Sequence, residues 1–343
     1  MKTTTNNNIV ISSIGFNSAM GTDISDFFNC SMDSFSSSVT IENHDPQNFL
    51  KPKGQRFLNK ATLVYCNTAF QAIHNRELIR YIEKTPERVG LYDGTELANL
   101  EDCFLFDLTA KNQGPDRVSP MKAPSTIANA AASQMAIQSG IKGPNFSVCA
   151  GMAGSLQAVD IACLHLKQGI IDYGVIASTE VRNQYQQVIQ NNRQKKSQEL
   201  GVSMILERAE SLEKDNKRPL AGIAMLHSET YTDHPDYFEA YLYEMLAPVI
   251  QSYDLDIIIV SGGASTLNSN RFESFLHDHK HSLKILYPEN NFGDLDNAGG
   301  MLGIAYAISV FNGLQPYKTN KMYILVLSID PSGIIIYTII EKK

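Results

Sequence analysis

Short apolar runs separated by longer amphipathic segments predict that strands and helices alternate along this chain. The apolar run at residues 9–15 ends in Gly15 and is followed by Thr22 and Asp23, which are typical helix caps, so the chain opens with a strand and a helix that ends at Phe28. The same patterns predict strands at residues 88–92, 145–149, 173–178, 202–206, 221–226 and 257–260, helices at residues 59–82, 97–108, 124–139, 153–168, 237–253 and 298–311, and a closing hairpin at residues 322–340.

The helix predicted at residues 153–168 is small or apolar on nearly every face, with Leu156, Val159 and Leu166 among its residues. A helix that is apolar all round must be buried, so we expect this one to run through the centre of the protein. His165 on the same helix is then expected to be a hydrogen-bonded core residue.

The alternation of elements runs through two cycles, and no short sequence repeat accompanies it. This organisation predicts an α/β protein built as a five-layered α/β/α/β/α sandwich of two similar halves. We place the halves at residues 1–213 and 214–343, because the highly charged segment 210–218 is the best candidate for the seam between them.

Composition excludes several functional classes. The 343 residues carry a net charge of -7, which argues against nucleic-acid binding because that requires concentrated Lys and Arg. The N-terminal residues lack the apolar segment of a signal peptide, and the apolar run 322–340 is interrupted by Asp330, Pro331, Ser332 and Gly333, so neither export nor a membrane span is expected. The five scattered cysteines contain no CxxC pair, which is typical of reduced thiols in a cytoplasmic protein.

The turn after the strand at 145–149 is the strongest candidate for chemistry. Small residues there connect a strand to a long helix, an arrangement that presents a nucleophile in many enzymes, and Met152 occupies the turn. A thioether can be neither deprotonated nor acylated. A single methionine usually fills a gap in a core, so Met152 gains meaning only from its surroundings.

Those surroundings resemble a known family. The block 143–148, the turn of small residues and the segments that follow to Glu180 resemble the nucleophile region of the ketosynthases of fatty-acid and polyketide synthesis, which have the thiolase fold. Ungapped placement from Asn145 to Asp172 puts Met152 at the position of the catalytic cysteine.

Two further family motifs can be placed. The segment 262–266 resembles the His-Gly-Thr-Ser-Thr motif, and the segment 289–294 resembles the motif that carries Lys-Ser and Gly-His. The two histidine positions are then Gly262 and Asp294, and the lysine position is Glu289. A ketosynthase needs a thiolate and two imidazoles for acyl transfer and decarboxylation, so these replacements predict that condensation has been lost.

A ketosynthase-like chain without its catalytic residues resembles a chain length factor, the non-catalytic subunit of type II polyketide synthases. The resemblance implies a heterodimer with an active ketosynthase, contact with an acyl carrier protein through that complex, and no cofactor or metal. It also implies that the helix after the strand at 88–92 lines a tunnel that limits chain length. The tunnel candidates are Glu96, Asn99 and Cys103, at positions i, i+3 and i+7 of one helix face, together with the hydrophobic Leu100 and Phe104.

The alternative is an active acyltransferase or decarboxylase that uses an unorthodox residue such as Cys149. We expect Cys149 to point into the packing of its strand, with no histidine in a family position to activate it. The group His277, Asp278, His279 and His281 suggests a solvated turn more than a metal site, and Arg193, Lys195 and Lys196 lie in a polar stretch, 183–198, expected to be a loop or an exposed helix.

Overall fold

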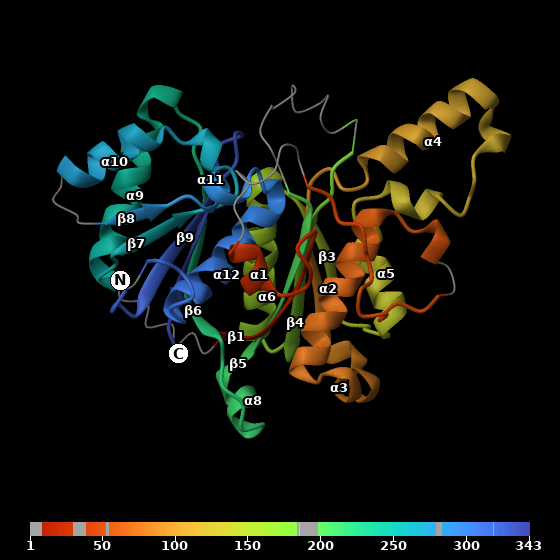
Figure 1. Ribbon diagram of the computed structural model, residues 1–343, viewed down its shortest axis with the longest axis horizontal. Helices are drawn as coiled ribbons and strands as arrows, with labels where there is room; N and C mark the ends of the chain where they lie inside the picture. Colours follow the sequence, from red (N-terminus) through yellow and green to blue (C-terminus); the bar gives the residue numbers. More distant parts are fainter. Residues whose placement is uncertain are drawn as a thin grey trace.

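The computed structural model describes residues 9–29, 39–52, 55–183, 185, 198–278, 283–317 and 319–343, and its described strands form a single sheet in the order β3-β2-β4-β5-β1-β6-β10-β9-β7-β8 (Figure 1). The strands are β1 (Ile9–Ser18), β2 (Val89–Thr95), β3 (Asn145–Cys149), β4 (Tyr173–Glu180), β5 (Leu200–Arg208), β6 (Ala221–Thr230), β7 (Ile257–Val260), β8 (Lys284–Leu286), β9 (Tyr323–Ile329) and β10 (Ile334–Glu341). The helices are α1 (Ile24–Phe28), α2 (Lys60–Arg76), α3 (Ile79–Lys84), α4 (Leu100–Gln113), α5 (Ala130–Ser139), α6 (Gly154–Lys167), α8 (Ala209–Lys214), α9 (Phe238–Tyr253), α10 (Ser269–Asp278), α11 (Pro288–Phe292) and α12 (Gly299–Phe311).

The sheet consists of two halves with the same topology. The order β3-β2-β4-β5-β1 on one side is matched by β8-β7-β9-β10-β6 on the other, so each strand has its counterpart five strands later in the chain. The parallel and antiparallel pairings also correspond. The halves meet where β1 pairs with β6 through Val10 with Gly222 and Ile11 with Ala221. This arrangement confirms the prediction of two similar α/β halves.

Helices and sheet form the five predicted layers (Figure 1). α2 and α5 cover the outer face of the first half in one apolar cluster, and α9 and α10 cover the outer face of the second half in another. α6 and α12 lie between the two halves in the largest cluster, which joins residues of both. The central layer is therefore a shared core, and it positions the starts of α6 and α12 next to each other.

The fully buried central helix is α12, in which every residue is buried. The expectation that 153–168 is buried all round was wrong at its C-terminal end, where Leu164 is 50% exposed. His165 is only half-buried, although its Nδ1 is hydrogen-bonded to the Tyr92 hydroxyl at 2.7 Å, as expected for a satisfied histidine. The reason is that this end of α6 reaches the free edge of the sheet beside β3.

Most predicted elements are present, with shifted ends. The helix expected at 59–82 begins after its cap Asn59 but breaks at Glu77, which has a left-handed φ of 68°, and continues as the separate α3. The helix expected at 97–108 begins only at Leu100. The short β8 and the helix α10 were not predicted.

Some predictions concern residues outside the described part of the chain. They are the stretch 186–197 with Arg193, Lys195 and Lys196, and the histidines His279 and His281. The boundary between residues 213 and 214 falls in α8, which connects β5 to β6, and remains a prediction. Among the described helices, none has both the length and the apolar character needed to cross a membrane.

Candidate functional site

The turn between β3 and α6 is a short 3₁₀ turn, Gly151–Ala153. Gly151 has φ +53°, and a Cβ at this position would lie 1.8 Å from Oδ2 of Asp330, so only glycine fits. Met152 is buried at 2% exposure. Its backbone N–H donates to Asp330 Oδ2 at 2.9 Å, across 178 residues of sequence. The predicted nucleophile position is thus packed into the core and tied to the turn between β9 and β10.

The turn after β7 lies directly against Met152. Gly262 and Gly263 have φ values of +87° and +79°. A Cβ on Gly262 would lie 2.9 Å from Ser328 Oγ and 3.0 Å from the carbonyl oxygen of Met152. There is consequently no room for an imidazole at the first histidine position.

Glu289 holds this glycine turn from α11. Its Oε1 accepts a hydrogen bond from the backbone N–H of Gly262 at 2.7 Å, and its Oε2 accepts one from Ala264 at 3.2 Å. Burial raises the pKa of Glu289 to about 8, and the nearby charge of Asp294 adds to the rise. At the lysine position of the family, the chain therefore has an acid that caps backbone donors.

Asp294 and Asp296 complete an acidic cluster beside Glu289. Asp294 is 6% exposed, and its Oδ1 accepts from the N–H of Asp296 at 3.3 Å. The guanidinium of Arg182 lies 3.5 Å from Asp296 Oδ2 and donates to the carbonyl oxygen of Asp294 at 3.2 Å. Burial and the charge of Asp294 raise the pKa of Asp296. Asp294, at the predicted second histidine position, thus lies beside two further buried carboxyl groups, those of Glu289 and Asp296.

A second 3₁₀ turn, Asp296–Ala298, begins α12 in the same way that the turn at Met152 begins α6. Both turns start at a residue with positive φ, and Asn297 takes the place that Met152 has in the first half. The side-chain amide of Asn297 donates to the carbonyl oxygen of Gly94 and, at 2.6 Å, to Ser178 Oγ. Each turn is therefore anchored by a contact with the opposite half.

The structure brings Met152, Gly262, Glu289 and Asp294 together, although they are far apart in sequence. Within the described part of the chain, this group supplies carboxylates and a thioether to the turn, and neither a thiol nor an imidazole is among the four side chains. Sequence reasoning missed the anchoring residues Asp330, Asn297 and Arg182. Asp330 and Asn297 each stand next to a turn of small residues, which is a common pattern in loops, and Arg182 has no such signal.

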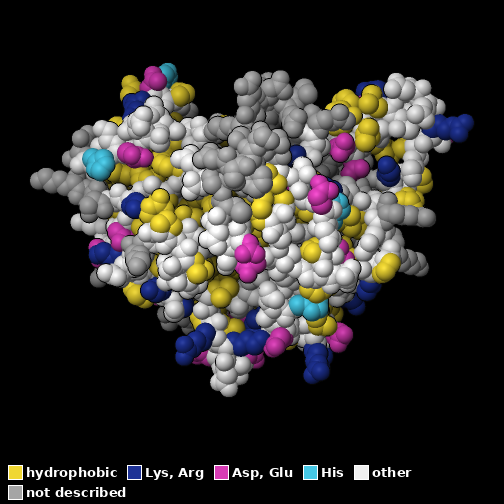
Figure 2. All heavy atoms as spheres, in the orientation of Figure 1, with side chains coloured by type: hydrophobic (Ala, Val, Ile, Leu, Met, Phe, Trp, Pro, Cys, Tyr) yellow, Lys and Arg dark blue, Asp and Glu magenta, His cyan; other side chains and the backbone are white. Residues whose placement is uncertain are grey.

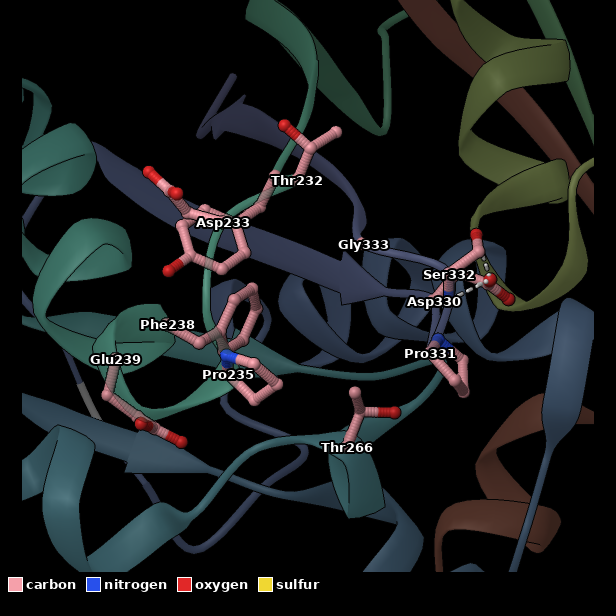
Figure 3. A pocket seen from close by; sticks show the side chains of 11 residues that line it. Thr232, Asp233, Pro235, Phe238, Glu239, Thr266, Asp330, Pro331, Ser332 and Gly333 are labelled. Atoms are coloured by element: carbon pink, nitrogen blue, oxygen red, sulfur yellow. Dashed lines mark hydrogen bonds between the residues drawn. The ribbon is translucent and has the colours of Figure 1, made fainter.

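A cavity of ≈ 350 Å³ lies next to this group, between the segment that follows β6 and the turn that follows β9 (Figure 3). Asp330 and Ser332 stand at the side of the cavity that faces α6. The wall consists of aromatic, proline, hydroxyl and carboxylate residues: Tyr231, Thr232, Asp233, Pro235, Phe238, Glu239, Thr266, Asp330, Pro331, Ser332 and Gly333.

The predicted tunnel residues do not share one helix face. Glu96 precedes α4, and Asn99 is the residue immediately before it, so the expected i, i+3, i+7 relation on a helix was wrong. Cys103 Sγ donates to the carbonyl oxygen of Thr126 at 2.8 Å. The ring of Phe104 is 42% exposed and lies 4.2 Å from that of Tyr185. Leu100, the first residue of α4, is partly exposed.

Cys149 is exposed, so the expectation that it points into packing was wrong, because β3 is the edge strand of the sheet. Partial burial and the charge of Asp93 raise the pKa of its thiol, which opposes formation of the reactive thiolate. His277 lies in the last turn of α10, and in the described residues no three His, Cys, Asp or Glu side chains are grouped to hold a metal ion.

Comparison with known proteins gives a consistent result. Residues 8–201, more than half of the chain, match the family model described as beta-ketoacyl synthase, N-terminal domain. The 3-oxoacyl-[acyl-carrier-protein] synthase 2 of Staphylococcus aureus is 25% identical over 140 residues, which are 41% of this chain and 34% of that protein. The match thus spans about a third of the length of this curated relative.

Solved structures resemble nearly the whole chain. One is a complex of a type II PKS acyl-carrier protein with its ketosynthase bound to the hexaketide (TM-score 0.79, 12% identity, 98% of this chain and 99% of that chain). Another is the ishigamide ketosynthase/chain length factor (TM-score 0.75, 18% identity, 97% of this chain and 99% of that chain). At these identities the likeness shows the fold, and it agrees with the predicted thiolase-like architecture.

Proposed function

This chain belongs to the beta-ketoacyl synthase family, and we propose that within it the chain is a non-catalytic chain length factor. In this role it pairs with an active ketosynthase and shapes the tunnel that limits chain length in type II polyketide synthesis. An acyl carrier protein reaches the complex through the ketosynthase. The cytoplasmic location and the absence of a cofactor or metal remain predictions from the sequence.

The observation that carries the proposal is the composition of the closed site around Met152. Acyl transfer requires a thiolate, and decarboxylation requires donors that stabilise an enolate. At the corresponding positions the chain has a buried thioether, a glycine without space for a side chain, and the carboxyl groups of Glu289 and Asp294. A carboxylate such as that of Asp294 repels a developing enolate, and the carboxyl of Glu289 is already engaged by two backbone N–H groups, so these residues disfavour the reaction that the family performs.

The free edge of the first half supports a partner subunit. β3 lies at one end of the sheet, and Asn145, Phe146 and Cys149 on it are exposed. Such an edge is a template for another strand. Its flanks are apolar, since Ile137 of α5 is 73% exposed and Leu164 of α6 is 50% exposed.

The apolar surface extends from this edge toward α4. Most of the exposed large apolar side chains of the described residues lie between positions 104 and 170, and we call this set the edge patch: Phe104, Leu105, Met121, Ile127, Ile137, Phe146, Leu164 and Ile170. Figure 2 shows hydrophobic side chains gathered over the projecting helix α4. Exposed apolar side chains in this number are typical of a protein interface.

The tunnel assignment follows from the same surface. α4 has no buried residue, so much of its surface is left for a partner subunit to cover. We propose that Glu96, Asn99, Leu100, Cys103 and Phe104 then border the tunnel at the interface. The charge of Glu96 is a minor contribution to the raised pKa of Asp296, which supports a position of Glu96 near the closed site.

Co-expression with an active type II ketosynthase tests the proposal. We expect a stable heterodimer, acyl label on the ketosynthase alone, and products whose length changes when Phe104 is replaced by Ala. The variant Cys149→Ala should leave turnover of the complex unchanged. Acylation of this chain itself, or lost turnover in Cys149→Ala, would favour the alternative of an active acyltransferase.

A further inference from the structure

The loss of catalytic residues does not by itself account for the contact between Asp330 and Met152. Asp330 Oδ2 accepts the N–H of Met152 at 2.9 Å and rests on Gly151, where a Cβ would overlap it. Its Oδ1 accepts from the N–H and the hydroxyl of Ser332 at 2.9 and 2.5 Å. Both oxygens are therefore occupied, and the carboxylate is held in one orientation.

The N–H of residue 152 is the donor that matters for acyl transfer at this turn. Backbone N–H groups at a nucleophile stabilise the negative oxygen that forms when a carbonyl is attacked. The N-terminal end of the long helix α6 adds a partial positive charge at the same place. A carboxylate on this donor occupies the space of the carbonyl oxygen and places a full negative charge there.

We propose that Asp330 is an internal plug, a carboxylate of the chain itself that fills the oxyanion-binding position at Met152 and excludes acyl thioesters from the turn. The proposal rests on the proposed non-catalytic function and adds a second block to it. The first block is the missing thiol. The second remains even if a thiol is restored.

The position of Asp330 in the cavity supports this role. The cavity of ≈ 350 Å³ has the volume of a small-molecule pocket, and Asp330 stands where its wall meets α6 (Figure 3). The turn that carries Asp330 is fixed by two backbone hydrogen bonds. The N–H of Asp330 donates to the carbonyl oxygen of Ile334 at 2.8 Å, and the N–H of Gly333 donates to the carbonyl oxygen of Asp330 at 2.9 Å. A fixed turn keeps the plug in place between the cavity and Met152.

The plug also connects the two halves of the sheet. Met152 lies in the turn before the central helix of the first half, and Asp330 follows β9 of the second half. The contact that closes the turn at Met152 is thus also part of the seam between the two halves. This dual role accounts for the presence of an acidic side chain beside a 2% exposed methionine.

Restoring the thiol gives a direct test. In a Cys149→Ala background, which removes the neighbouring thiol, we compare Met152→Cys with Met152→Cys/Asp330→Ala. The probe is the hexanoyl thioester of N-acetylcysteamine, and mass spectrometry measures acyl transfer to residue 152. In this exchange the introduced thiol loses its proton and attacks the carbonyl carbon as a thiolate, the bond to the N-acetylcysteamine sulfur breaks, and the departing thiolate takes up that proton.

We expect the plug to suppress acylation and to affect simple alkylation less. Removing Asp330 should raise the acylation rate at least 10-fold, while iodoacetamide, whose reaction forms no oxyanion, should gain less than 3-fold. Equal gains with both probes, or no gain in acylation, would overturn the proposal. The matched control is Asp233→Ala, which removes a carboxylate from the opposite part of the same cavity and should leave acylation within 2-fold.

A second variant covers the case in which Asp330→Ala does not fold. Asp330→Asn keeps the size and one acceptor oxygen but removes the charge, and we expect at least a 3-fold gain in acylation. An unchanged rate in a folded Asp330→Asn variant would count against the plug. Different results would disprove the proposed function itself. These are acylation of the unmodified chain, or absence of a heterodimer.

Discussion

β3 and β8 occupy equivalent places at opposite ends of the sheet, yet their surfaces differ. β3 has five residues and no charge, and exposed apolar side chains of α5 and α6 flank it. β8 has three residues, and its exposed Lys284 places its ammonium 3.9 Å from the ring centre of Tyr317. Short length and lysine are common ways to protect an edge strand. The same topology thus leaves an open edge in the first half, where we propose that the partner docks, and a guarded edge in the second.

We expect the largest effect from substitutions at the proposed docking edge beside β3. The double variant Ile137→Asp/Leu164→Asp places two carboxylates in the edge patch, and we expect at least a 1,000-fold loss in affinity for the ketosynthase, about 4 kcal/mol. Sedimentation of the co-expressed complex measures it. Leu314→Asp/Met322→Asp, which changes equally exposed residues of the second half, should leave the complex intact. Equal loss in both variants would remove the distinction between the halves.

The next effect concerns the seam between the halves. Gly151→Ala should lower the free energy of unfolding by about 3 kcal/mol, because its Cβ overlaps the Asp330 carboxylate and its φ is positive. Gly169→Ala has a similar φ of +69° but open space around its Cβ, so it should cost only about 1 kcal/mol. Urea unfolding compares the two, and equal losses would mean that the overlap has no energetic role.

The matching turn of the second half gives a smaller effect. Asn297→Ala leaves the carbonyl oxygen of Gly94 with one donor fewer in a fully buried site, and we expect a loss of about 2–3 kcal/mol. Asn312→Ala at the other end of α12 is the control, with an expected change below about 0.5 kcal/mol. A loss in Asn297→Ala as small as in the control would show that the two turns are not equivalent anchors.

We expect the smallest effect in the pH dependence of stability, because the buried glutamates of the two halves have different surroundings. Glu199 of the first half is paired with Lys60 at 2.5 Å, whereas the pKa of Glu289 in the second half is raised to about 8. A raised carboxyl pKa means that the folded state holds a proton that the unfolded state has released above pH 4.5, so stability falls as the pH rises toward 8. Glu289→Gln should remove about 2 kcal/mol of that fall between pH 6 and 8. Thermal unfolding across this range measures it, and an unchanged slope would contradict the assignment.

Local patterns were sufficient to predict much of the fold. β3 and β7 begin and end where their apolar runs do, and α9 is within one residue of its prediction. The burial of α6 was overestimated because apolar composition does not distinguish a core face from an exposed apolar face. β8 was missed because three residues carry too little periodicity.

The site was predictable only in part. Motif spacing located Met152, Gly262, Glu289 and Asp294, and the fold brings them together. It could not indicate Asp330, whose partner is 178 residues away, or that the carboxyl of Glu289 would cap two backbone N–H groups. Such contacts depend on the meeting of the two halves, which no local pattern describes.

The uncovered β3 also has a consequence for supply of the protein in a cell. Under the proposed function, a chain made in excess of its ketosynthase partner keeps an open, uncharged edge that can pair with other unpaired strands. Aggregation and proteolysis would then remove the surplus, so the amount of this subunit that persists is set by the amount of its partner. Balanced synthesis of the two chains is therefore a requirement that the exposed edge of one strand imposes.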